Sequence, residues 1–98
     1  MNNSASVLKE LAKDKAILLV EDDELILENL ARMASHFFAK TYKSTNAQDA
    51  LEIYKEISST MAMIVVTDIN LGGKSGIDLT HSLKSLNKDQ KVIAISGT

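Results

Sequence analysis

Three short, continuous apolar runs constrain the fold of this sequence more than any other feature. They are AILLV at residues 16–20, MIVVTD at 63–68 and VIAIS at 92–96. Runs of this length are too short for a typical buried helix and are typical of strands covered on both faces, as in parallel sheets. A weaker strand is predicted at 40–45, where β-branched residues alternate with polar ones but hydrophobicity is low. We therefore expect four strands, with 40–45 at an edge of the sheet.

The segments between these runs carry helical periodicity. Apolar residues recur at three- and four-residue spacing over 24–38, over 47–57 and from 76 to about 86. Asn46 is a favourable N-cap for the second of these helices. Strands that alternate with helices in this way require right-handed crossovers and a parallel sheet with helices on both faces.

The first fourteen residues are predicted to be an extension, followed by a single α/β domain at 15–98. Residues 5–13 place Val7, Leu8, Leu11 and Ala12 on one side of an amphipathic segment. A helix this short is marginal unless it packs on something. We expect a short helix that helps to cover an otherwise bare face of the domain.

Composition excludes several classes of function. The 98 residues include no cysteine, which excludes disulfide scaffolds, thiol catalysis and cysteine-based zinc sites. A net charge of −2 with scattered lysines argues against direct binding to nucleic acid. No apolar stretch approaches the roughly 20 residues of a membrane span, and the N-terminus lacks the pattern of a signal peptide. We expect a soluble, cytoplasmic protein without nucleic-acid or membrane partners.

Polar and acidic residues follow three of the predicted strands, where ligands bind in an open parallel sheet. These residues are Glu21, Asp22, Asp23, Asp68, Asn70 and Ser96. Neighbouring carboxylates repel one another, and a hard divalent cation with oxygen ligands relieves the repulsion. A carboxylate beside such a cation can also act as a nucleophile toward phosphorus. The pattern therefore predicts a magnesium site that supports formation of an aspartyl-phosphate.

Three stretches together resemble the signature of response-regulator receiver domains: LLVEDDE at 18–24, VVTDINLGGKSGIDL at 65–79 and VIAISGT at 92–98. The resemblance implies a flavodoxin-like doubly wound parallel sheet with strand order 2-1-3-4-5. It also implies a signalling module of a two-component system rather than an enzyme. Such a module accepts a phosphoryl group from a histidine kinase or a phosphotransfer protein, with Mg²⁺ (or Mn²⁺) as the cofactor.

The same resemblance implies a role for each site residue. Asp68 is the phosphoacceptor and also a metal ligand. Asp22 holds the metal directly, Glu21 holds it through water, and Asn70 binds it through its backbone carbonyl. Ser96 supplies the switch hydroxyl that bonds the phosphoryl oxygen after transfer.

The sequence departs from the family pattern in two places. Gly72 stands where a proline is usual, which predicts a more mobile loop after Asp68. The family pattern also continues through another helix, a fifth strand with a lysine that pairs with the phosphoryl group, and a closing helix, none of which lies within these 98 residues. We therefore expect an incomplete sheet with an open edge at 92–96 and an uncovered apolar face, which favours self-association or exchange of elements between copies.

Several alternatives remain beside this interpretation. One is a receiver-like assembly module that is never phosphorylated, which the missing lysine favours. Another is an aspartyl-phosphate phosphohydrolase, but Asn70 occupies the position where such enzymes need a proton-donating aspartate. Asp22 and Asp23 are also explained as negative charge at a helix N-terminus. A calcium loop starting at Asp68 is rejected, because its twelfth position is Leu79 instead of a glutamate.

Overall fold

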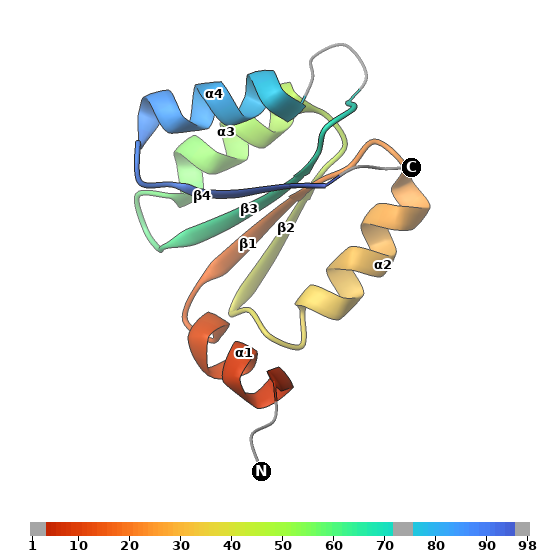
Figure 1. The fold of residues 1–98 in the computed structure, drawn as a ribbon, viewed down its shortest axis with the longest axis vertical. Helices are drawn as coiled ribbons and strands as arrows, with labels where there is room; N and C mark the ends of the chain where they lie inside the picture. Colours follow the sequence, from red (N-terminus) through yellow and green to blue (C-terminus); the bar gives the residue numbers. More distant parts are fainter. Residues whose placement is uncertain (1–3, 72–75, 96–98) are drawn as a thin grey trace.

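The computed structural model describes residues 4–71 and 76–95 (Figure 1). Strands and helices alternate along the chain after a first, separate helix. In order they are α1 (Ser4–Ala12), β1 (Ala16–Val20), α2 (Glu24–Ala34), β2 (Lys40–Ser44), α3 (Ala47–Ile57), β3 (Met63–Asp68), α4 (Gly76–Leu86) and β4 (Lys91–Ile95). The alternation predicted from the apolar runs is confirmed.

The strands form one parallel sheet in the order β2-β1-β3-β4. This order is the flavodoxin-like one, as the sequence predicted. The weakly hydrophobic β2 lies at one edge, also as expected, and β4 lies at the other. β1 and β3 occupy the centre, and Val20 of β1 is in register with Thr67 of β3.

Side chains on β1 face two separate cores. Leu18 and Val20 pack in the core beneath α3 and α4, while Ile17 and Leu19 pack beneath α2. Figure 1 shows α3 and α4 together on one face of the sheet and α2 on the other. All five residues of β1 are buried, which explains its continuous apolar sequence.

Helix α2 ends at Ala34, so the prediction of a helix to residue 38 is wrong for its last turn. The amides of Phe37 and Phe38 both donate to the carbonyl of Ala34, each at 3.0 Å, which closes a tight turn instead of continuing the helix. Phe38 still packs against the core beneath α2. The periodicity indicated that this side chain packs against the core, and the turn places it there just as a helix would.

A buried polar contact ties the α3 side of the sheet together. The Tyr54 hydroxyl donates to Oε1 of Gln90 at 2.7 Å, and Nε2 of Gln90 donates to the carbonyls of Met63 (2.7 Å) and Lys91 (2.9 Å). Both polar side chains are buried, so these hydrogen bonds replace those lost to water. The contact fixes α3 against the first residues of β3 and β4.

The N-terminal amphipathic segment forms α1, as predicted. Ala12 is buried, whereas Val7 and Leu11 are exposed. Figure 1 shows α1 extending beyond the amino-terminal end of β1. The division into residues 1–14 and 15–98 stays a prediction. Among the helices of residues 4–71 and 76–95, none has the length and apolar character that crossing a membrane requires.

Candidate functional site

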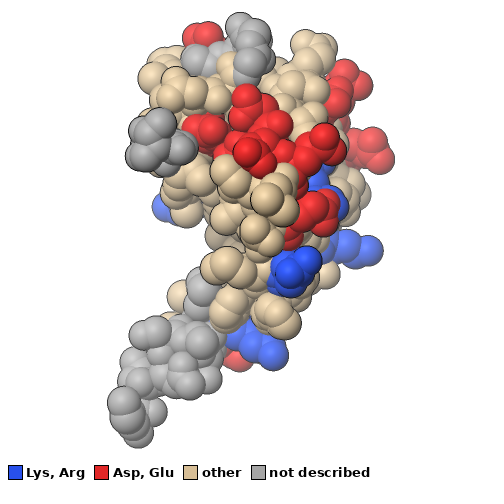
Figure 2. Space-filling view, turned by 90° about the vertical axis from the view of Figure 1, so that its right-hand side faces the viewer, with Lys and Arg blue, Asp and Glu red and all other residues tan. Residues whose placement is uncertain are grey.

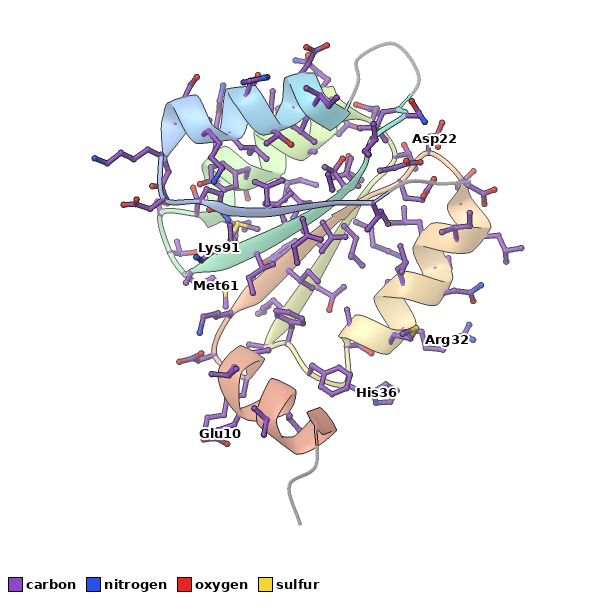
Figure 3. All side chains as sticks on the ribbon, in the orientation of Figure 1. Glu10, Asp22, Arg32, His36, Met61 and Lys91 are labelled. Atoms are coloured by element: carbon purple, nitrogen blue, oxygen red, sulfur yellow. The ribbon has the colours of Figure 1, made fainter. Side chains whose placement is uncertain are left out.

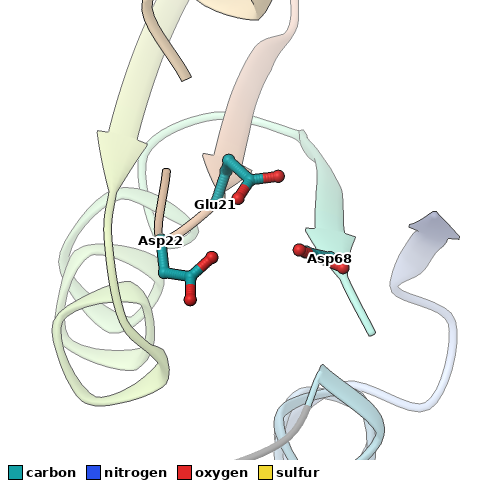
Figure 4. A group of neighbouring side chains, drawn as sticks. All are labelled: Glu21, Asp22 and Asp68. Carbon is teal, nitrogen blue, oxygen red and sulfur yellow. The ribbon is translucent and has the colours of Figure 1, made fainter. Parts of the chain in front are cut away.

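The carboxyl ends of the two central strands bring three carboxylates together. Each of Glu21, Asp22 and Asp68 offers an oxygen, and these three oxygens lie within 4.8 Å of one another. Figure 4 shows the side chains around the gap between the ends of β1 and β3. The juxtaposition follows from strand pairing, because Val20 and Thr67 are in register and the acidic residues come directly after them.

Two of the three carboxylates are buried. Glu21 is 3% exposed and Asp68 is 5% exposed, while Asp22 faces solvent. The Glu21 amide donates to the carbonyl of Ser44 at 3.0 Å, which extends the pairing of β1 with β2 by one residue. Glu21 is therefore held by backbone bonding in a place where water cannot fully solvate its charge.

This environment raises the pKa of Glu21 above its ordinary value of 4.5. Burial is the largest cause, and the neighbouring carboxylates of Asp22 and Asp68 act in the same direction. A hydrogen bond from the Asp23 amide partly opposes the increase. The site thus concentrates negative charge that nothing in the described protein neutralises in full.

Backbone amides orient two of the carboxylates. The Asp23 amide donates to Oε2 of Glu21 at 2.9 Å, and the Asn70 amide donates to Oδ1 of Asp68 at 3.1 Å. Each amide belongs to the residue two positions after the carboxylate. The chain directly after each carboxylate therefore helps to orient its side chain.

Asp23 has a different role from its neighbours. Its Oδ1 accepts hydrogen bonds from the amides of Leu25 (3.0 Å) and Ile26 (3.1 Å), which makes Asp23 the N-cap of α2. The helix-terminus interpretation, left open for both aspartates, thus applies to Asp23. Asp22 instead lies in the carboxylate cluster.

The backbone that carries Asp68 is fixed on both sides. The Ile69 amide donates to the carbonyl of Ile95 at 2.9 Å, which ties the loop to β4. The Gly76 amide donates to the Ile69 carbonyl at 2.8 Å, which ties it to the start of α4. The hydroxyl of Thr67 donates to the Asp68 carbonyl at 3.0 Å. Asp68, the last residue of β3, is therefore followed by a loop that is anchored to a strand and a helix.

Gly76 is the residue whose importance the sequence did not explain. A Cβ at this position would lie 2.0 Å from the Asp68 carbonyl oxygen and 2.9 Å from its carbonyl carbon. Only glycine lets the first turn of α4 approach the backbone this closely. The sequence shows a glycine eight residues after Asp68. The reason that this position requires glycine, the close approach of α4 to the Asp68 carbonyl, is visible only in the structure.

The structure tests the predictions for Asn70 only in part and does not describe Ser96. Asn70 is exposed and contributes its amide to Asp68. Its predicted role as a metal ligand through the carbonyl stays a prediction. Ser96, the predicted switch hydroxyl, and Gly72 lie outside the described residues.

The acidic site lies at one end of the molecule. In the face drawn in Figure 2, Asp and Glu side chains gather toward the end opposite α1, and Lys and Arg side chains lie below them. Figure 3 likewise places Asp22 and Glu10 of α1 at opposite ends. A cation approaching the acidic end meets an attractive potential.

A pH dependence of stability follows from the raised pKa of Glu21. A folded-state pKa above the unfolded value stabilises the protein below the unfolded pKa of about 4.5, and this stabilisation is lost as the pH rises through the folded value. We expect Glu21→Gln to flatten this dependence and, at neutral pH without metal, to raise the free energy of unfolding by about 1 kcal/mol. Urea unfolding at several pH values with a chelator present measures both effects. An equally steep decline in the variant would contradict the assignment.

A second prediction concerns Gly76. We expect Gly76→Ala to lower the free energy of unfolding by about 1–3 kcal/mol, because the new methyl group overlaps the Asp68 carbonyl. Amide chemical shifts should change most at residues 68–71. Ile77→Ala, at an exposed position in the same turn, is the matched control and should change little. Equal stability of the two variants would show that the close approach is not structurally important.

Comparison with known proteins agrees with this fold. The family model of the response regulator receiver domain matches residues 17–98. Regulatory protein VirG of Agrobacterium tumefaciens (strain 15955) is 33% identical over 87 residues, a match covering 85% of this chain and 30% of VirG. The chain spans less than a third of the length of that relative.

Solved structures show the same architecture. A response regulator receiver domain protein from Clostridium thermocellum aligns with a TM-score of 0.78 at 22% identity, covering 84% of this chain and 64% of that one. A chain of the CheX–CheY–BeF₃–Mg²⁺ complex from Borrelia burgdorferi aligns with a TM-score of 0.77 at 22% identity, covering 91% and 66%. These likenesses concern the fold. The family match over residues 17–98 shows that this chain belongs to the response regulator receiver domain family.

Proposed function

We propose that this chain is the phosphoacceptor module of a two-component system. Asp68 accepts a phosphoryl group from a histidine kinase or a phosphotransfer protein in a reaction that requires Mg²⁺ or Mn²⁺. The observation that carries the proposal is the cluster of Glu21, Asp22 and Asp68, whose oxygens lie within 4.8 Å at the ends of adjacent strands.

The donor set fits a hard divalent cation. All three side chains offer oxygen, which Mg²⁺ prefers, and Mg²⁺ usually takes only one or two carboxylates while it keeps several waters. The mixture of a solvent-exposed Asp22 with buried Glu21 and Asp68 suits such a partly hydrated ion. Asp22 and Asp68 would bind it directly, Glu21 through water and Asn70 through its carbonyl. When bound, the cation neutralises charge on the phosphoryl oxygens and the carboxylates.

The chain's own residues then position the nucleophile. A carboxylate oxygen of Asp68 forms a bond to phosphorus as the bond from phosphorus to the donor's imidazole nitrogen breaks, and that nitrogen keeps the electron pair. The amide of Asn70 holds the Asp68 carboxylate in orientation. In this proposal Ser96 donates its hydroxyl to a phosphoryl oxygen after transfer.

The alternatives are weaker on chemical grounds. A phosphohydrolase needs an acid two residues after the nucleophile, and the side chain of Asn70 cannot transfer a proton. VirG, the curated relative, is a regulatory protein. An assembly module that is never phosphorylated remains the second candidate, and it is distinguished by the following measurement.

Phosphorylation is tested by incubation with acetyl phosphate and Mg²⁺, followed by intact-mass measurement. We expect the parent chain to gain one phosphoryl group, and Asp68→Asn or addition of a chelator to abolish the gain. Glu52→Gln, an exposed acidic position on α3, is the control and should behave like the parent. A gain that persists in Asp68→Asn would contradict the assignment of the nucleophile. No gain in the parent would favour the assembly module.

Two exposed apolar residues beside the site support a protein as the phosphodonor. Leu25 is 73% exposed and Ile26 is also exposed, both in the first turn of α2 directly after the acidic residues. Exposed apolar residues next to a reactive group are typical of protein-contact surfaces. A partner that brings a phosphohistidine to Asp68 would cover them.

This partner surface can be tested separately from the chemistry. With a phosphorylated histidine phosphotransfer domain that transfers to the parent, we expect Leu25→Ser to slow transfer by about tenfold, through weaker docking. Labelling by acetyl phosphate should not change. Leu86→Ser, an exposed leucine on α4, is the matched control. Equal slowing with both phosphodonors would place the effect in the site and not in docking.

A further inference from the structure

Thr67 is a buried polar residue to which the proposed phosphoryl transfer gives no role. It precedes Asp68 in β3, and it is 0% exposed. Side chains alternate along a strand, so Thr67 points to the same face as Val65, which packs in the core beneath α3 and α4. The Asp68 side chain leaves the strand toward the other face. Thr67 can therefore act on the reaction only through the backbone.

The hydroxyl of Thr67 lies on a face of the sheet that is otherwise apolar. The core on this face includes Val65, Leu79 and Leu83, all of them 0% exposed. A valine would fill nearly the same space as Thr67 without placing a polar atom in this core, where an unpaired hydroxyl is unfavourable. The hydroxyl is paired instead, because it donates to the Asp68 carbonyl at 3.0 Å. The reason for a threonine therefore lies in this hydrogen bond.

This hydrogen bond completes the fixation of one peptide unit. The peptide that joins Asp68 to Ile69 is a rigid plane whose polar groups are the Asp68 carbonyl and the Ile69 amide. The amide donates to the Ile95 carbonyl of β4 at 2.9 Å, and the carbonyl accepts from Thr67. The plane is thus fixed at both of its polar groups. Without the hydroxyl, the carbonyl would lose the partner that sets its direction.

The direction of this peptide determines where the next residue of the site lies. Asn70 follows directly, and its amide donates to Oδ1 of Asp68 at 3.1 Å. The proposed function also makes the Asn70 carbonyl a metal ligand. A turn of the 68–69 peptide would therefore move Asn70 relative to the Asp68 carboxylate, and small displacements of groups around a reacting atom slow a reaction substantially.

We propose that Thr67 is a positioning residue for phosphoryl transfer, because its hydroxyl holds the 68–69 peptide at the angle that sets Asp68 and Asn70 around the cation. This inference rests on the proposed function of Asp68. Thr67 itself contacts neither the phosphodonor nor the ion. The hydroxyl of Thr67, rather than the volume of its side chain, then determines the rate of phosphorylation and the affinity for Mg²⁺.

Thr67→Val and Thr67→Ser separate the hydroxyl from the volume of the side chain. Valine removes the hydroxyl, whereas serine keeps it and removes a buried methyl group. We expect Thr67→Val to lower the rate of Mg²⁺-dependent labelling by acetyl phosphate by about tenfold. Thr67→Ser should retain the parent rate, although urea unfolding should show that it is less stable. Val65→Ala, which also loses buried methyl groups on this face, is the matched control and should retain the parent rate.

Nuclear magnetic resonance provides a measurement that does not depend on phosphorylation. In the metal-free chain, we expect the Asp68 carbonyl carbon and the Asn70 amide to change their chemical shifts in Thr67→Val and to keep them in Thr67→Ser. Titration with Mg²⁺, followed at the Asn70 amide, should give a dissociation constant about tenfold higher in Thr67→Val than in the parent, because groups that orient metal ligands contribute to metal affinity.

The possible outcomes separate this inference from the proposed function. Equal labelling rates and equal Mg²⁺ affinities in the parent and Thr67→Val would overturn the role of Thr67. Rates that follow stability, with Thr67→Ser and Val65→Ala as slow as Thr67→Val, would also overturn it. A parent that gains no phosphoryl group would count against the proposed function, and the Mg²⁺ titration then decides the role of Thr67. A parent that is neither labelled nor binds Mg²⁺ would overturn both.

Discussion

The parallel pairing of β1 with β3 is the constraint on which the rest of this structure depends. It sets Val20 beside Thr67, so that the residues that follow the two strands must meet. Glu21, Asp22 and Asp68 are far apart along the chain, and only this register brings their oxygens within 4.8 Å. A slip of one residue would turn Asp68 to the other face of the sheet and separate the cluster.

The site concentrates charge at a place where charge is unfavourable. Burial and the adjacent carboxylates raise the pKa of Glu21, and the amides of Asp23 and Asn70 each stabilise one carboxylate by a hydrogen bond. These two hydrogen bonds orient the side chains without removing the repulsion. A divalent cation would relieve this repulsion, which is the physical reason for proposing metal-assisted phosphoryl transfer at this site.

The two faces of the sheet are used differently. The face beneath α3 and α4 is closed by packing and by the buried Tyr54–Gln90 contact, and α4 presses so closely on the Asp68 backbone that only Gly76 fits. The face beneath α2 is closed only in part, and an apolar groove remains there. The face beneath α3 and α4 therefore holds the backbone of Asp68 in place.

The apolar runs by themselves determined the strands, their parallel arrangement and the edge position of β2, because burial on both faces leaves a direct pattern in the sequence. The acidic residues at the strand ends likewise indicated which side chains would gather.

Other features were decided by tertiary structure. Periodicity could not show that α2 stops at Ala34, since Phe38 packs against the core from the turn as it would from a helix. Nor could it separate Asp22 from Asp23, one in the cluster and the other an N-cap. The need for glycine at position 76 and the direction of α1 depend on contacts between distant segments, and such contacts leave no local pattern in the chain.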